Sequence, residues 1–246
     1  MKLVFLGTTG YHPNDRRHTA CLMLPELGVV IDAGTAMYRV RDRLMTPTLD
    51  IFLSHAHLDH VVGLTYMFDI LHEKNIGRVT VHGAAEHLAA VQEHLFVPPM
   101  FPVKPPFSYQ PLTERAALGE EGWLTHFPLE HPGGVVGYRL DWPDRSLAYV
   151  TDTSARPDAD YVEKIRGVDV LVHECYFSDD MHEQAKLTGH SCTTQVAQVA
   201  RDAAVGRLLL VHIDPMSVED DPIGLDTARA IFPDTQIAWD NMEVVF

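Results

Sequence analysis

The feature that most constrains this chain is the segment Ser54–His60, in which three histidines and one aspartate follow a short apolar run. Alternate residues of an extended segment point to the same side, so His55, His57 and Asp59 can face one centre. A helix beginning near Asp59 would turn His60 toward the same point. Imidazole and carboxylate groups that converge in this way bind divalent metals, whereas a surface turn would carry such residues only by chance. The segment therefore predicts a metal site at the end of a strand.

Strand-like apolar runs recur along the 246 residues, and helical patterns lie between some of them. Strands are expected within Leu3–Leu6, Ala20–Leu24, Val29–Ile31, Ile51–Leu53, Val79–Val81, Leu124–Phe127, Val135–Leu140, Leu147–Val150, Val168–Val172, Leu208–Val211 and Gln236–Trp239. Apolar spacing predicts helices over Val61–His72, Ala84–Phe96 and Thr193–Ala204, the last with Ser191 as its N-cap. This order favours a layered α/β sandwich, built as a single domain of residues 1–246, over a simple alternating parallel sheet.

One segment breaks these patterns. Val97–Pro111 contains six prolines, which excludes a regular helix and a central strand. We expect a stiff loop that is ordered by Phe101, Phe107 and Tyr109. The loop is either a plain connector or a wall over a functional site, and both interpretations stay open.

The run His-Ala-His-Leu-Asp-His at residues 55–60 resembles the H-x-H-x-D-H signature of the metallo-β-lactamase superfamily. That resemblance implies a four-layer αββα sandwich whose strand-end loops hold one or two metals. The family places three later ligands after strands, in the order His, Asp and His. His131, Asp152 and His212 stand at matching places, and Asp32-Ala33-Gly34 matches the Asp-x-Gly that ends an early strand of the family.

The resemblance further implies a dinuclear site. One metal would be held by His55, His57 and His131, and the other by Asp59, His60 and His212, with Asp152 as the bridge. Two divalent ions about 3.5–4 Å apart need a shared anionic bridge to offset their repulsion. Zinc is the first choice because it suits imidazole-rich sites with an open position, and manganese or iron are the alternatives. The metals would lower the pKa of a bridging water and so supply a hydroxide nucleophile.

A narrower resemblance is to the tRNA 3′-processing endonuclease RNase Z and its phosphodiesterase relatives. It is carried by Gly7-Thr8-Thr9, Arg17-His18-Thr19, Val172-His173-Glu174 and Gly189-His190-Ser191. The resemblance implies that His190 is a general acid rather than a permanent ligand, and that Glu174 orients it. Asp59 would both bind metal and accept the proton of the nucleophilic water. The favoured function is a metal-dependent phosphodiesterase.

Charge separates the possible substrates. The chain has 34 acidic against 19 basic residues, a net charge of -15, and nucleic acid affinity depends mainly on phosphate neutralisation by Lys and Arg. The tRNA-cutting relatives also carry a Gly- and Pro-rich arm, whereas Val97–Pro111 is short and has no glycine. A small anionic ester such as a cyclic nucleotide is therefore favoured over tRNA.

Three alternatives to that function remain. They are tRNA 3′ processing, hydrolysis of a thioester, lactone or sulfate ester on the same metals, and a non-catalytic binding role. The three cysteines form no C-x-x-C pair, and no apolar run is long enough for a signal peptide or a membrane span. We therefore expect a cytoplasmic protein without membrane contact, and the resemblance implies a homodimer.

Overall fold

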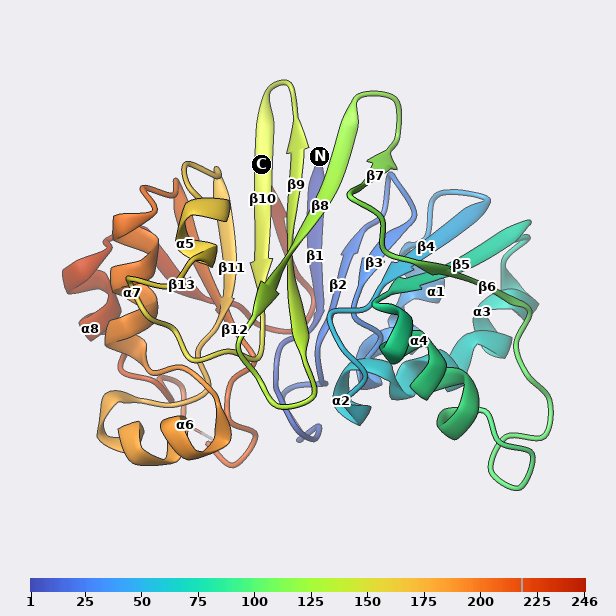
Figure 1. The fold of residues 1–246 in the computed structure, drawn as a ribbon, viewed down its shortest axis with the longest axis horizontal. Coiled ribbons are helices and arrows are strands. Elements are labelled where there is room, and N and C mark those ends of the chain that lie inside the picture. The colour runs from blue at the N-terminus through green and yellow to red at the C-terminus, as the bar shows by residue number, and fades with distance from the viewer. Residues whose placement is uncertain (218) are drawn as a thin grey trace. The chain divides into compact units, whose positions relative to one another are not determined.

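The computed structural model describes residues 1–217 and 219–246, which form two compact units (Figure 1). The N-terminal unit comprises Met1–Thr113 with Trp239–Val245, and the C-terminal unit comprises Glu114–Ala238 with Phe246. Among the described residues, each unit contains one seven-stranded sheet. The single domain expected for residues 1–246 stays a prediction.

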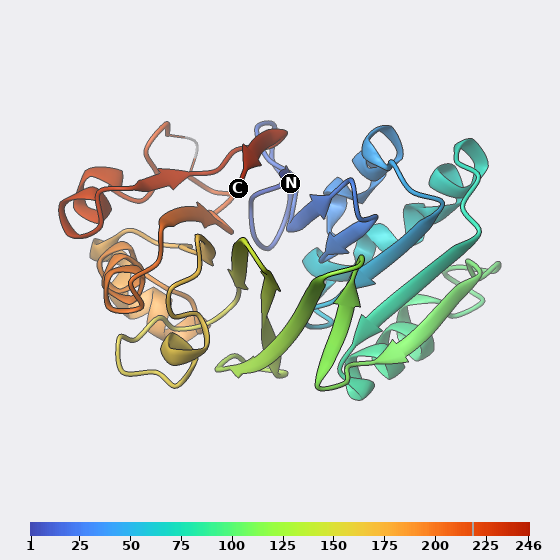
Figure 2. The same ribbon diagram turned by 90° about the horizontal axis from the view of Figure 1, so that it is seen from above.

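The sheet of the N-terminal unit has antiparallel and parallel parts. Its order is β14 (Met242–Val245), β1 (Lys2–Gly7), β2 (Cys21–Leu24), β3 (Val29–Ile31), β4 (Thr48–Phe52), β5 (Arg78–Gly83) and β6 (Phe107–Pro111). Figure 2 shows this order as a run of strands from blue β1 to green β6. Strands β3 to β6 are parallel to one another. Because parallel strands end at the same edge, the segments that follow β3 and β4 lie side by side.

Short helices follow the strands of this unit. They are η1 (Thr35–Arg39), α1 (Val40–Arg43), α2 (Leu58–Val61), η2 (Val62–Tyr66), α3 (Met67–Glu73), α4 (Ala85–Ala90) and η3 (Val91–Leu95). Their apolar residues, such as Met37 and Leu64, pack in one core with alternate residues of the sheet, such as Leu49 and Ile51. The period-two pattern of the strands thus selects the face that the helices cover.

Strand β6 corrects the expectation for Val97–Pro111. The prolines do exclude a central strand, yet Phe107–Pro111 forms a strand at the edge of the sheet, paired with β5 on one side. An edge strand tolerates proline because only one of its sides needs hydrogen-bond donors. The predicted role of the aromatic residues is confirmed, because Phe101, Phe107 and Tyr109 pack against the core of this unit.

The sheet of the C-terminal unit is also mixed. Its order is β13 (Thr235–Ile237), β12 (Arg207–Val211), β11 (Val170–Glu174), β10 (Arg145–Val150), β9 (Val135–Trp142), β8 (Gly122–Leu129) and β7 (Arg115–Leu118). Strands β10 to β13 are parallel, and β7 to β10 are antiparallel. The carboxyl ends of β10, β11 and β12 therefore meet at one edge, which is where Asp152, Glu174 and His212 stand.

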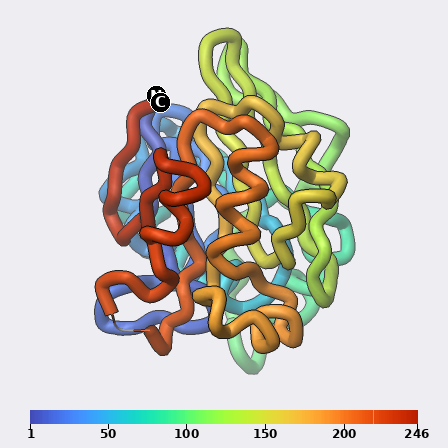
Figure 3. The backbone as a smooth tube through the Cα atoms, turned by 90° about the vertical axis from the view of Figure 1, so that its left-hand side faces the viewer, coloured from blue at the N-terminus to red at the C-terminus, as the bar shows by residue number. Residues whose placement is uncertain are grey.

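The helices of this unit are α5 (Tyr161–Lys164), η4 (Asp179–Met181), α6 (His182–Thr188), α7 (Thr193–Asp202) and α8 (Leu225–Ile231). In Figure 3 the orange helix α7 stands between the yellow segment of α5 and the red segment of α8. Val196 and Val199 of α7 are buried in one core with Leu208 and Leu210 of β12. This packing covers one face of the parallel strands.

The start of α7 differs from the predicted one. Its N-cap residue is Cys192, not Ser191, and no side chain of the cap bonds to the helix. The Ser191 hydroxyl instead donates to the Thr153 carbonyl at 2.6 Å. Asp179 takes over the capping, because its carboxylate accepts from the Thr194 amide at 2.9 Å. A tertiary contact has thus displaced the local cap.

The cysteines and the helix lengths bear on two further expectations. All three cysteines are buried and none forms a disulfide, as their spacing predicts. In the part of the chain that the structure describes, no helix has both the length and the apolar composition that crossing a membrane requires.

A buried histidine on β11 predicts how stability depends on pH. His173 donates from Nδ1 to the Glu174 carbonyl at 2.7 Å and accepts from the Tyr161 hydroxyl at 3.0 Å. Burial holds the pKa of His173 below its ordinary value of 6.5, so the unfolded chain binds the proton first as the pH falls. The stabilisation is complete above pH 6.5 and is lost as the pH falls from there through the lower pKa of the folded state.

We therefore expect the free energy of unfolding of chelator-treated protein to fall with decreasing pH below about 6.5. Urea titrations at a series of pH values measure this. In a plot of the free energy of unfolding against pH, His173→Gln should lower the slope below pH 6.5 by the equivalent of up to one bound proton. Equal slopes for the two proteins would contradict the prediction.

Candidate metal centre

The four potential ligands of the N-terminal unit lie together after β4. His57 is the N-cap residue of α2, in extended conformation, and Asp59 and His60 lie within that four-residue helix, as predicted. The His55 ring lies 4.4 Å from the His57 ring and 4.2 Å from the His60 ring, centroid to centroid. His60 Nε2 is 3.4 Å from Asp59 Oδ2. This group offers three imidazoles and one carboxylate within a few ångströms.

Asp32, which follows β3, orders this group from behind. Its fully buried carboxylate accepts from the Ser54 amide at 2.7 Å and from the Ser54 hydroxyl at 2.9 Å. Its Oδ2 also lies 2.8 Å from His60 Nδ1. Because the carboxylate accepts the Nδ1 proton, Nε2 of His60 keeps its lone pair for a metal. The sequence indicates Asp32 only through the Asp-x-Gly motif and does not indicate this role.

Asp32→Ala should therefore weaken both the fold and the ligand group. Removing the carboxylate leaves buried donors of Ser54 and His60 without their acceptor, at about 1–3 kcal/mol each. We expect the free energy of unfolding of chelator-treated protein to fall by about 3 kcal/mol or more, measured in urea, because three donors lose their acceptor. Asp15→Ala, on an exposed loop of the same unit, is the control and should change it by less than about 0.5 kcal/mol.

Two other residues of the N-terminal unit bear on the site. The backbone amide of Tyr11 donates to Asp59 Oδ2 at 2.8 Å, a contact for which the sequence gives no signal. His18, which belongs to the Arg17-His18-Thr19 motif, places its ring against Tyr38 and within 3.2 Å of the Thr35 hydroxyl. The Tyr11 contact shows that the segment between β1 and β2 borders the ligand group, whereas His18 contacts η1.

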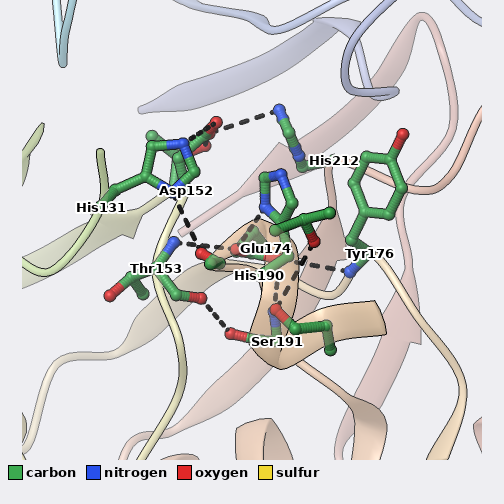
Figure 4. A network of polar contacts seen from close by, with 12 residues as sticks. His131, Asp152, Thr153, Glu174, Tyr176, His190, Ser191 and His212 are labelled. Atoms are coloured by element: carbon green, nitrogen blue, oxygen red, sulfur yellow. Dashed lines mark hydrogen bonds and ion pairs between the residues drawn. The ribbon is translucent and has the colours of Figure 1, made fainter. Parts of the chain in front are cut away.

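The C-terminal unit holds a second group, formed by His131, Asp152 and His212 (Figure 4). The two carboxylate oxygens of Asp152 face different imidazoles. Oδ2 lies 3.7 Å from His131 Nε2, and Oδ1 lies 3.3 Å from His212 Nε2. A carboxylate placed in this way can join two metal ions, each with its own histidine.

The state of His131 suits a metal ligand. Its Nδ1 donates to the carbonyl of Gly189 at 3.0 Å, which leaves Nε2 to face Asp152. Burial lowers the pKa of His131, while the nearby Asp152 carboxylate opposes the shift. The ring is therefore neutral near pH 7, as a ligand must be. Gly189 is needed because its φ is +76° and an added Cβ would lie 3.0 Å from His131 Nδ1.

Strained backbone marks the same positions. Asp32, Asp152 and His212 each follow a strand and have φ values of +59°, +41° and +57°. Residues other than glycine adopt this region rarely and at a cost of about 1 kcal/mol or more, which the surrounding structure must offset. All three side chains are buried. Such conformations gather at functional sites, because they turn a side chain out of the strand direction.

His190 and Glu174 form a separate pair beside this group (Figure 4). Glu174 is fully buried at the end of β11, and its Oε1 accepts from His190 Nδ1 at 3.0 Å and from the Thr153 amide at 2.8 Å. Its Oε2 accepts from the amides of Tyr176 and Ser191, each at 3.2 Å. Four donors thus hold the carboxylate. Glu174 is therefore not part of a surface ion pair, because its side chain is fully buried.

Tyr176 fixes the plane of the His190 ring. The two rings stack at 4.6 Å between centroids and 17° between planes. Hydrogen bonding at Nδ1 and stacking on one face leave the Nε2 edge of His190 as the end that can act on a substrate. The ligand atoms of His190 also lie within 4.8 Å of those of His131 and Asp152, and of those of Glu174 and His212. The sequence gives no signal for Tyr176.

A mixed sheet in each unit, with His/Asp groups at strand ends, defines a metallo-β-lactamase type of protein. A family profile described as "Beta-lactamase superfamily domain" matches residues 28–213, and the chain belongs to that superfamily. It is 28% identical to ribonuclease Z of Metallosphaera sedula (95% of this chain, 94% of that protein) and 26% identical to ribonuclease BN of Enterobacter sp. strain 638 (99% of each).

Among solved structures, the metallo-β-lactamase fold protein YhfI from Bacillus subtilis superposes with a TM-score of 0.80 at 20% identity, over 99% of each chain. The expected metallo-β-lactamase fold is confirmed, as is the resemblance to the RNase Z branch. The chain is a hydrolase of this superfamily, with His/Asp groups that can bind metal.

Proposed function

We propose that this chain is a metal-dependent phosphodiesterase in which His190 is the general acid. The observation that carries the proposal is the buried Glu174 carboxylate, which four donors hold in place and which orients His190 through Nδ1. Phosphodiester hydrolysis needs a proton donor for the leaving alkoxide. The likeness to ribonucleases Z and BN over nearly the whole chain supports the same bond type.

The donor set fits a pair of divalent metals. We propose His55, His57 and His131 for one ion, Asp59, His60 and His212 for the other, and Asp152 as the bridge. The chemistry of the donors supports this, because hydrogen bonds at Nδ1 turn Nε2 of His60 toward Asp59 and Nε2 of His131 toward Asp152. Asp152 in turn directs one oxygen toward each of two imidazoles. When bound, the metals would stabilise charge on the non-bridging phosphate oxygens and lower the pKa of water. Zinc is preferred for the imidazole-rich set.

The residues of the chain would divide the proton transfers. Asp59 accepts the proton of the attacking water. His190 gives the proton on Nε2 to the leaving oxygen, while Glu174 keeps the proton on Nδ1 in place. Tyr176 keeps the ring in plane for this transfer.

A small, accessible phosphodiester is the substrate class that the charge supports. With a net charge of -15, the chain has few cations to neutralise the phosphates of a long polyanion. The names of the relatives favour tRNA 3′ processing as the second candidate. The two substrates differ in how many phosphates must be held, so salt dependence separates them.

A substrate panel tests the proposal. Protein stripped with chelator and reloaded with zinc or manganese is assayed on bis(p-nitrophenyl) phosphate, cyclic nucleotides, precursor tRNA, a lactone and a thioester. We expect metal-dependent turnover of the small phosphodiesters. Turnover of the lactone or thioester without any phosphodiester would overturn the proposal, and salt-sensitive cleavage of precursor tRNA alone would favour the second candidate.

A further inference from the structure

The C-terminal unit contains a cavity of about 400 Å³ that is lined by His190. It lies between the segment after β10 (Ser154–Arg156) and the helices α6 and α7. Its apolar lining includes Ala185 and Cys192, which are buried. The volume is in the range of cavities that hold a small ligand.

The position of His190 defines which part of a substrate reaches this cavity. A general acid must lie within hydrogen-bond distance of the oxygen that leaves. The group attached to that oxygen therefore lies next to His190, and His190 forms part of the cavity wall. His190 is the one residue that the cavity lining shares with the groups around Asp152, because His131, Asp152 and His212 do not line it. If His190 is the acid, as proposed above, the cavity reaches the leaving group at His190.

The charged residues of the cavity favour one kind of leaving group. Lys186 and Arg156 line it against a single acid, Glu130, although the chain as a whole is strongly acidic. Lys186 forms no ion pair with any residue that the structure describes. Arg156 pairs with Glu130 at 3.0 Å and lies 3.7 Å from Asp158, and the side chains of Arg156, Glu130 and Asp158 are 51%, 70% and 88% exposed. The pair has two parallel hydrogen bonds, of 3.0 and 3.1 Å, so an anionic ligand must compete with Glu130 for Arg156 in water.

We propose that this cavity is the leaving-group pocket and that it selects leaving groups with an anionic substituent, such as a second phosphate or a carboxylate. The inference rests on the proposed phosphodiesterase function. Hydrolysis breaks the phosphorus–oxygen bond to the leaving group, water supplies the new bond to phosphorus, and the leaving oxygen ends protonated. The cationic residues would contact the substituent and not the reacting atoms.

A pair of substrates with almost the same leaving oxygen tests the proposal. They are the methyl phosphate diesters of 4-hydroxyphenylacetate, which is anionic, and of its uncharged methyl ester. We expect the metal-loaded enzyme to prefer the anionic substrate in kcat/KM by at least about fivefold, with a preference that falls as salt rises. The binding of free 4-hydroxyphenylacetate to metal-free protein, measured by calorimetry, gives a second readout without catalysis.

Substitutions in both directions complete the test. Lys186→Gln should lower the preference for the anionic diester and weaken 4-hydroxyphenylacetate binding by about threefold or more. Glu130→Gln should raise that preference and strengthen the binding. Lys164→Gln, on α5 and away from the cavity, is the matched control with the same change in charge. A ratio of kcat/KM near one, which neither variant changes, would contradict the proposed leaving-group pocket. The proposed phosphodiesterase function would stand. Charge-dependent binding without turnover of either diester would support the anion site and overturn the phosphodiesterase.

Discussion

Asp152→Ala is expected to reduce the metal content of the purified protein from two ions per chain to one or fewer. The Asp152 oxygens lie 3.7 Å from His131 Nε2 and 3.3 Å from His212 Nε2, so this carboxylate is placed between two imidazole donors. Without it, two divalent ions would repel each other with no shared anion between them. Elemental analysis of protein loaded with zinc and freed of excess metal measures the change.

A second variant separates the lost charge from backbone strain. Asp152 has a φ of +41°, a conformation that asparagine tolerates better than alanine. Asp152→Asn therefore keeps the turn and removes the negative charge, and it should also lose metal. Asp144→Ala, on the exposed hairpin between β9 and β10, is the control and should keep two ions. Two ions per chain in both Asp152 variants would refute the bridging role.

Local spacing explains why the ligand run could be predicted from the sequence. The ligands at residues 55–60 are neighbours in the chain, so the extended-to-helix transition at His57 alone decides which way they point. Asp32 reaches Ser54 and His60 from 22 and 28 residues away, through parallel pairing of β3 with β4. No local pattern encodes such a contact.

Tertiary competition explains what the sequence predicted wrongly or missed. Ser191 has the residue type of an N-cap, but its hydroxyl is taken by the Thr153 carbonyl, and Asp179 serves the helix instead. The prolines before β6 suggest a loop, yet the open edge of the sheet accepts Phe107–Pro111 as a strand. In each case the interaction that decides the structure comes from another helix, strand or loop. Residue spacing and the local propensities of the segment itself therefore could not reveal it.

His190→Ala is expected to slow hydrolysis of a phosphodiester with a poor leaving group by about 10²–10⁴-fold, the usual contribution of a general acid. An alkyl leaving group needs a proton as its bond to phosphorus breaks, whereas p-nitrophenolate leaves without one. The same variant should therefore lose far less on bis(p-nitrophenyl) phosphate. Steady-state kinetics on both substrates at equal zinc content give the comparison.

The contrast between the two substrates distinguishes an acid from a structural residue. His190 and Glu174 are joined by a 3.0 Å hydrogen bond, so Glu174→Gln should show the same dependence on the leaving group in weaker form, because an amide orients the ring less firmly than a carboxylate. Loss of metal or of folding would instead slow both substrates alike. An equal loss on the alkyl and p-nitrophenyl esters, with zinc retained, would therefore remove His190 from the acid role and leave its place beside Asp152 and His131 as that of a third potential ligand.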